Sequence, residues 1–228
     1  VSDGAEKKKM LEKAVAGFSE FAVGDGTTDL FIESVLGRGL ANLELGETAD
    51  GERDLRYVLD AKEAAADKKQ KAQIALVDAY LRNNQVQKAI DGSKGFGSAG
   101  GENASALKYL RIRALVLGAK QPGAAGDRYR QEAISLMEQL RRQGGTWAQR
   151  VDAVLAAASS EDPAKWAAAG GGSFATWQLA RTAVAKGDCK QAVPLLQDML
   201  KSEDADVKPR SGDAGYLLAV CQFQAGQQ

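Results

Sequence analysis

The chain has 228 residues, of which 44% are hydrophobic and 26% are charged, and its 30 acidic residues balance its 30 basic residues. A chain without net charge has no overall electrostatic field that would collect nucleic acid or an anionic membrane, so we expect neither as a partner. No uninterrupted apolar run approaches the roughly 20 residues that cross a bilayer, so we expect no membrane span in this sequence.

The same composition argues against catalysis and metal binding. Histidine is absent, which removes the most common general base and the most common imidazole ligand for metals. The paired carboxylates Glu161 and Asp162 stand beside a proline, where nothing would desolvate them and shift their pKa values. Residues 95–100 match the dinucleotide-binding pattern as a string, but they follow a helical segment instead of a strand, so we expect a loop. We therefore expect no enzyme activity within this sequence, no metal and no cofactor.

Hydrophobic residues recur at helical spacing along the sequence. Leu107, Leu110, Ala114 and Leu117 are one example, and the alternating β-branched runs that are typical of strands are missing. The sequence therefore predicts an all-α protein. In chain order the predicted helices span residues 5–21, 28–45, 51–66, 69–83, 85–94, 103–119, 126–143, 146–159, 162–169, 173–186, 189–202 and 213–225.

Turn residues separate these helices at intervals that scatter around roughly 34 residues. The turn signals stand at Gly46, Asn84, Gly118, near Ala158, Gly187 and Gly226. In one of these turns Asn84 is placed to cap the helix that begins at Gln85, with Gln87 reaching back. Asp188 and Gln191 repeat that arrangement near the C-terminus, so we expect side-chain caps at both turns.

Two segments have the pattern of a tight helical hairpin. The first runs from Ala75 to Ile90 as a helix, a short polar turn and a second helix, and the other surrounds Gly187 and Asp188. Both resemble the tetratricopeptide repeat, whose signature places a leucine and a small residue, then an aromatic residue, before the turn and an alanine after it.

The match to that signature is partial in each segment. In the first, Val77 stands at the small position, Tyr80 is the aromatic residue and Ala89 follows the turn. In the second, Ala180 stands at the small position, but Ala183 replaces the aromatic residue.

The resemblance implies a single array over residues 1–228, a right-handed α-solenoid of about six hairpins with degenerate N-terminal ones. Such repeats bind proteins, so the implied function is non-enzymatic interaction or scaffolding, with a protein or peptide partner on the concave face. Two alternatives stay open. The chain could be a structural spacer in a larger assembly, or an accessory helical domain of an enzyme whose catalytic part lies outside this segment.

The resemblance also implies which side chains line the concave face. They are Ile74, Asp78, Arg82, Lys108, Ile112, Trp177, Arg181 and Tyr216. Trp, Tyr and Arg are frequent at interface hot spots, so we expect Trp177, Arg181 and Tyr216 to dominate binding. The alternative for Trp177 and Tyr216 is that both only fill gaps between repeats.

The two cysteines, Cys189 and Cys221, are too far apart for a CxxC pair and too few for a disulfide framework. We expect both to be free thiols. The last predicted helix is apolar on more than one face, and the sequence does not begin with methionine, so we expect a piece of a longer protein in which the array continues. The location stays open between a bacterial cell envelope or periplasm and the cytoplasm.

Overall fold

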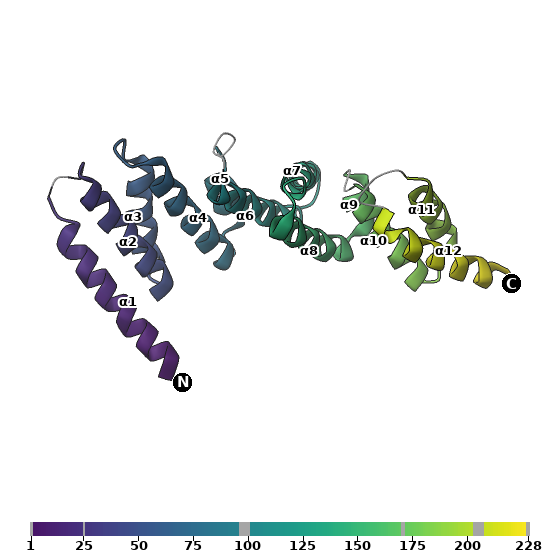
Figure 1. Cartoon of the computed structure of the whole chain (residues 1–228), viewed down its shortest axis with the longest axis horizontal. Helices are drawn as coiled ribbons and strands as arrows, with labels where there is room; N and C mark the ends of the chain where they lie inside the picture. Colours follow the sequence, from purple (N-terminus) through teal and green to yellow (C-terminus); the bar gives the residue numbers. More distant parts are fainter. Residues whose placement is uncertain (1, 25, 96–100, 170–171, 203–207, 227–228) are drawn as a thin grey trace. The chain divides into compact units, whose positions relative to one another are not determined.

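The computed structural model describes residues 2–24, 26–95, 101–169, 172–202 and 208–226 (Figure 1). Within these ranges the chain forms twelve α-helices, one short 3-10 helix and no β-strand, which confirms the all-α prediction. The bounds are α1 (Ser2–Phe21), α2 (Asp29–Leu45), α3 (Thr48–Asp60), α4 (Ala66–Arg82), α5 (Val86–Gly92), α6 (Glu102–Gly118), α7 (Ala124–Arg141), α8 (Gly145–Glu161), α9 (Pro163–Ala168), α10 (Gly172–Ala185), α11 (Cys189–Lys201), the 3-10 helix η1 (Lys208–Arg210) and α12 (Ser211–Gly226).

Each predicted helix overlaps one of these twelve, and the largest difference is at the end of α3. The sequence predicts helix to residue 66, whereas α3 ends at Asp60 and Ala61 adopts an extended conformation. The residues that follow are alanine, lysine and glutamate, all strong helix formers. The turn nevertheless buries the side chain of Ala64, a tertiary contact that overrides local helix propensity. The loop expected at residues 95–100 lies almost wholly outside the described residues.

The chain divides into two compact units, unit 1 (Val1–Ala114) and unit 2 (Leu115–Gln228), with the boundary inside α6, and each is described by itself. Among the described residues, every strongly packed pair of helices is consecutive or next but one along the chain. In unit 1, for example, α2 packs on α3 and also on α4, and in unit 2 α10 packs on α11 and also on α12. This pattern is that of a helical repeat, in which each hairpin is covered by its neighbour.

Three tight hairpins share one turn geometry. In each, a turn residue one or two positions after the first helix has a positive φ, 87° at Gly46, 53° at Asn84 and 74° at Gly187, and the second helix begins two residues later. The next backbone amide donates to the carbonyl five residues earlier, as in a Schellman motif. These bonds join Glu47 to Asn42 at 2.9 Å, Gln85 to Tyr80 at 2.8 Å and Asp188 to Ala183 at 2.9 Å.

Of the two predicted helix N-caps, one is confirmed and the other is wrong. The carboxylate of Asp188 accepts a hydrogen bond from the backbone N–H of Gln191 at 3.1 Å and caps α11. Asn84, however, ends the first helix in the left-handed conformation instead of capping the second. The N-cap of α5 is Gln85, whose side chain makes no capping bond. Asparagine is favoured both as an N-cap and as the left-handed residue after a helix, so the sequence alone did not distinguish these two roles.

Glycines let the first helices of unit 1 approach closely. A Cβ atom on Gly37 of α2 would lie 2.5 Å from the ring of Phe18 on α1. A Cβ atom on Gly51 of α3 would lie 2.6 Å from the side chain of Leu43 and 3.0 Å from the carbonyl oxygen of Gly39. The α2–α3 hairpin is therefore held at a separation that only glycine permits at these positions.

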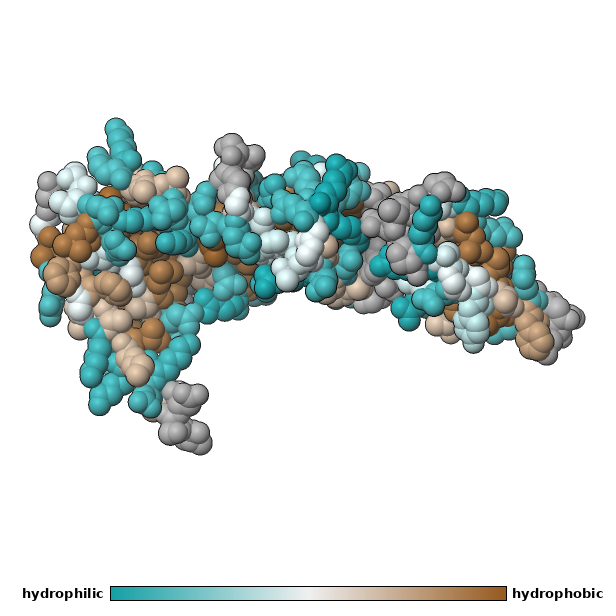
Figure 2. All heavy atoms as spheres, in the orientation of Figure 1, coloured by the Kyte–Doolittle hydropathy of each residue, from teal (hydrophilic) through white to brown (hydrophobic). Residues whose placement is uncertain are grey.

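Most side chains visible in Figure 2 are hydrophilic, with hydrophobic ones grouped towards the α1–α3 end of unit 1 and over α11 and α12 of unit 2. The large hydrophobic residues with substantial exposure are Met10, Phe21, Val23, Leu30, Leu40, Tyr57, Leu200, Tyr216 and Phe223. None of the helices in the described part of the chain is both long enough and apolar enough to cross a membrane.

Candidate functional site

Five charged side chains form a continuous row across four helices of unit 1. This charged row consists of Lys7 on α1, Glu44 on α2, Arg82 and Asp78 on α4, and Arg113 on α6. The ammonium of Lys7 lies 3.0 Å from Glu44, which lies 3.6 Å from Arg82. Arg82 lies 3.1 Å from Asp78, which in turn lies 3.7 Å from Arg113. The signs alternate along the row, with three cations and two anions.

The repeated hairpin geometry explains why these residues meet. Glu44 stands two residues before the turn glycine Gly46, and Arg82 stands two residues before Asn84, the equivalent turn residue of the next hairpin. The two side chains therefore occupy equivalent places on α2 and α4. Because these helices pack together, equivalent positions face each other, and here they carry opposite charges.

The side chains of the charged row are exposed, which limits their contribution to stability and leaves them accessible. Its side chains are between 37% and 63% exposed. Ion pairs in such surroundings contribute only about 0–1 kcal/mol each, because water screens them and the long side chains lose freedom. The row therefore contributes little to the fold, and its donors and acceptors are accessible to another molecule.

Glu44 is the titratable group of the row whose pKa is shifted. A hydrogen bond from Lys7 and the positive charge of Lys7 lower the pKa of this carboxyl, partial desolvation opposes the effect, and Arg82 adds to it. Glu44 therefore keeps its negative charge at a lower pH than an isolated glutamate does.

In unit 1 the structure places two of the five expected concave-face residues, Asp78 and Arg82, in the charged row. Ile74 and Lys108 are half-buried. Ile112 is 0% exposed and belongs to the core, so its expected place on an exposed surface is corrected. Its neighbour Arg113 reaches the row instead. The predicted exposed position on α6 was thus off by one residue, which corresponds to about 100° around the helix.

Lys7, Glu44 and Arg113 were missed by sequence reasoning. The signal for Glu44 was present, because it precedes its turn by the same distance as Arg82. Lys7 lies outside any repeat pattern, and its place depends on how α1 packs on α2.

In unit 2 the expected residues Trp177, Arg181 and Tyr216 do not share one exposed surface. Trp177 is 6% exposed and lies in a core cluster that includes Leu196 and Cys221. This agrees with the alternative that it fills space between helices. The guanidinium of Arg181 lies 5.8 Å from the centre of the Trp177 ring as a cation–π contact. Tyr216, in contrast, is 70% exposed on α12.

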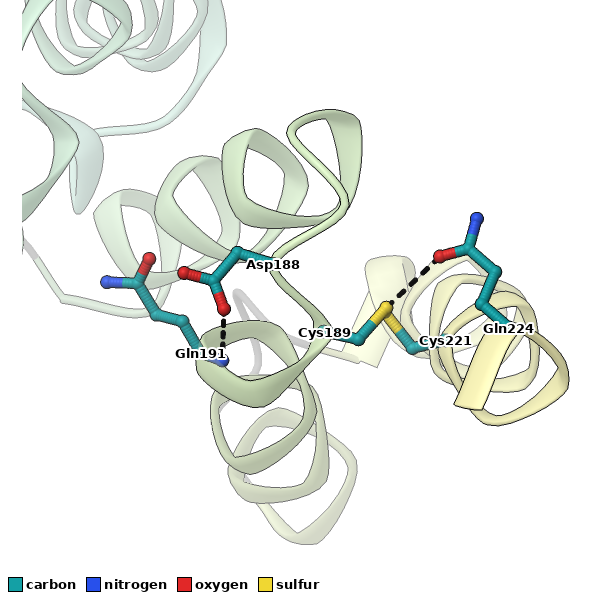
Figure 3. Close-up of a disulfide and its surroundings, with 5 residues drawn as sticks. All are labelled: Asp188, Cys189, Gln191, Cys221 and Gln224. Carbon is teal, nitrogen blue, oxygen red and sulfur yellow. Dashed lines mark hydrogen bonds between the residues drawn. A yellow bond between two sulfur atoms is a disulfide. The ribbon is translucent and has the colours of Figure 1, made fainter. Parts of the chain in front are cut away.

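The expectation of free thiols is wrong, because Cys189 and Cys221 form a disulfide (Figure 3). Cys189 begins α11 and Cys221 lies in α12, and the packing of these helices brings the two Cα atoms to 5.3 Å. The side-chain oxygen of Gln224 lies 3.3 Å from the Cys189 sulfur. A disulfide sulfur carries no hydrogen to donate, so this is a close contact. Sequence separation alone could not show that the two helices are neighbours.

Within the described ranges, no three acidic or cysteine side chains are grouped so that they could hold a metal ion. Comparison of the chain with protein-family models, with curated proteins and with solved structures gave no match. The arrangement of its own residues is therefore the basis for assigning a function.

Proposed function

We propose that this chain is a non-enzymatic interaction module built as a tetratricopeptide-like right-handed solenoid, and that unit 1 binds a partner protein or peptide through the charged row. The observation that carries this proposal is the pairing of Glu44 with Arg82 at equivalent places on consecutive hairpins. In a helical repeat, equivalent positions on the first helices form one continuous surface. An exposed charged surface of this kind suits recognition better than stability.

The chemistry of the row defines the partner. Lys7, Arg82 and Arg113 can each bind a carboxylate, while Glu44 and Asp78 can each bind a cation. A partner segment with acidic and basic side chains in complementary order would replace the internal pairs with pairs of its own. Charges arranged in this way set orientation and specificity more than raw affinity, so we expect binding to weaken as salt is raised.

A comparison of bait proteins tests the proposal. The full chain, Arg82→Glu and Arg53→Glu would be used to recover binding proteins from the source organism, with the recovered proteins quantified for each bait. Arg53 is the matched control, because it lies on α3, is 68% exposed and pairs with Asp50 and Asp54, neither of which belongs to the row. We expect at least one protein to be recovered by the full chain and by Arg53→Glu but lost with Arg82→Glu.

One control and one contrary outcome complete this test. Thermal melting of all three baits must show the same fold, since only then does a loss of binding report on the surface. Recovery of identical proteins by all three baits would contradict binding at the charged row and favour a spacer role.

A further inference from the structure

Unit 1 contains a second feature, a pocket of about 290 Å³ on another side of α4. Its wall residues are Arg56 and Leu59 of α3, Gln73, Leu76 and Tyr80 of α4, and Lys88, Asp91 and Gly92 of α5. Tyr80 is two residues from both Asp78 and Arg82, which corresponds to about 200° around the helix. The pocket and the charged row therefore lie on opposite sides of α4.

Two cations are fixed at this pocket by a single carboxylate. The Nε atom of Arg56 donates to Glu52 at 2.9 Å, and the Nζ atom of Lys88 lies 3.4 Å from the other oxygen of Glu52. The hydroxyl of Tyr80 donates to Glu52 at 2.8 Å and accepts from Nη2 of Arg56 at 3.0 Å. The Lys88 ammonium also lies 5.3 Å from the centre of the Tyr80 ring. Glu52 and Tyr80 thus hold both cations on the same side of the pocket.

The charges around the pocket leave an excess of positive charge. Arg56 and Lys88 share Glu52, which lies behind the wall, whereas the acidic wall residue, Asp91, already accepts hydrogen bonds from Lys94 at 2.6 Å and Gln87 at 2.9 Å. The guanidinium of Arg56 presents five N–H donors, and the contacts in the described structure engage Nε and Nη2, so the Nη1 donors are available. An anion entering here meets two cations and two carboxylates, Glu52 and Asp91, that already accept hydrogen bonds.

The remaining wall is apolar. Leu59, Leu76 and the ring of Tyr80 form a surface against which methylene groups can pack. A volume near the lower end of the roughly 300–1,000 Å³ usual for ligand sites accommodates one amino-acid side chain or a molecule of that size.

We propose that this pocket binds a carboxylate on a short apolar stem, with the carboxylate on Nη1 of Arg56 and the ammonium of Lys88 and the stem against Leu59 and Leu76. The same chemistry could come from a glutamate side chain of a protein partner or from a free small dicarboxylate. This site goes beyond the proposed function, because it uses none of the residues of the charged row.

Calorimetric titration of the full chain tests the site with three probes. N-acetyl-glutamate N-methylamide represents a side chain in a peptide, glutarate represents a free dicarboxylate, and N-acetyl-glutamine N-methylamide is the neutral match of the first. We expect saturable binding of at least one acid and none of the neutral amide. Tighter binding of the capped glutamate identifies a protein partner as the source, and tighter binding of glutarate identifies a small molecule.

Variants then locate the binding. Arg56→Gln and Lys88→Met each keep an uncharged stem, and each should weaken binding of the acid by about tenfold or more, the usual effect of removing a charged hydrogen bond. Arg53→Gln, on the same helix as Arg56 but outside the pocket, should bind like the unmodified chain. The proposal is overturned if neither acid binds, if the neutral amide binds equally, or if Arg56→Gln and Lys88→Met, both folded, leave affinity unchanged.

Discussion

Asn84 illustrates how single residues shape this molecule. Among the described residues it is the one non-glycine position with a positive φ, and its counterparts in the other two tight hairpins are Gly46 and Gly187. Asparagine tolerates the left-handed conformation better than other L-residues but less well than glycine. The turn between α4 and α5 is therefore built with a small conformational cost that its counterparts avoid.

We predict that Asn84→Gly keeps or raises the free energy of unfolding, by up to about 1 kcal/mol, whereas Asn84→Val lowers it by about 1–2 kcal/mol. Asn83 is the matched control, because its φ is −91° and glycine brings no benefit there. Urea denaturation of the three variants Asn84→Gly, Asn84→Val and Asn83→Gly measures the difference. Equal destabilisation by the two glycine variants would contradict the role assigned to Asn84.

Tyr80 gives a second prediction at this scale. Burial raises the pKa of its hydroxyl to about 12 from 10.0, and the hydrogen bond to Glu52 adds to the effect. The folded state therefore holds this proton more tightly than the unfolded state. The resulting stabilisation is complete below pH 10 and is lost as the pH rises from 10 towards 12.

The free energy of unfolding should thus fall more steeply between pH 10 and pH 12 in the unmodified chain than in Tyr80→Phe. Tyr80→Phe should be less stable at neutral pH, because it leaves Glu52 and Arg56 without their shared partner. Urea titrations across this pH range measure both slopes. Parallel slopes would show that the tyrosine does not titrate as the burial of its hydroxyl requires.

At the scale of elements, the packing of α2 on α1 and on α3 includes close approaches at glycine. Glycine inside a helix normally costs about 0.5–1 kcal/mol relative to alanine. At Gly51 that cost is offset by the contact it allows, since a Cβ atom there would overlap Leu43. The crossing of α2 and α3 therefore depends on residues without side chains.

Two similar substitutions of glycine by alanine should change the free energy of unfolding in opposite directions. Gly51→Ala should lower the free energy of unfolding by about 1–3 kcal/mol, because Leu43 and the Gly39 carbonyl must move. Gly17→Ala in α1, where a Cβ atom would meet nothing within 4 Å, should raise it by about 0.5–1 kcal/mol. Chemical denaturation of the two variants checks the signs, and stabilisation by Gly51→Ala would show that α2 and α3 are less tightly packed.

At the scale of the whole molecule, the strongly packed helix pairs of the described residues are close together in the sequence, and one such pair is also joined covalently. The disulfide between Cys189 and Cys221 closes a loop with a sequence separation of 32 residues in unit 2 and ties α12 to α11. Disulfides persist in oxidising compartments and are rare where thiols are kept reduced. The bond is therefore expected to form where the chain meets oxidising conditions.

Reduction should accordingly destabilise unit 2. Closing a loop of this length contributes about 3.7 kcal/mol by the chain-entropy relation, and reductant should remove that amount. Hydrogen exchange with and without reductant should show faster exchange in α11 and α12 and unchanged exchange in α2 to α5. The double variant Cys189→Ser with Cys221→Ser should not respond to reductant. Equal exchange in α12 under both conditions would mean that the bond carries no stability.

The sequence by itself determined the helical class, the positions of the twelve helices and the turn positions at Gly46 and Gly187. Those features follow from hydrophobic periodicity and from residues with special backbone freedom, which are local properties. The resemblance to a helical repeat singled out Asp78 and Arg82, whose side chains are 37% and 49% exposed, and their place on a concave face stays a prediction. The single solenoid of about six hairpins stays a prediction.

Tertiary structure decided what depends on neighbours distant along the chain. It joined Cys189 to Cys221 through the packing of α11 on α12, and it turned Ile112 inwards and Arg113 outwards. It buried Trp177 and left Tyr216 exposed. A periodic pattern of hydrophobic residues predicts that a helix has an apolar face. Which residues at the edge of that face are covered depends on the rotation of the helix against its neighbours, because about 100° separates one residue from the next.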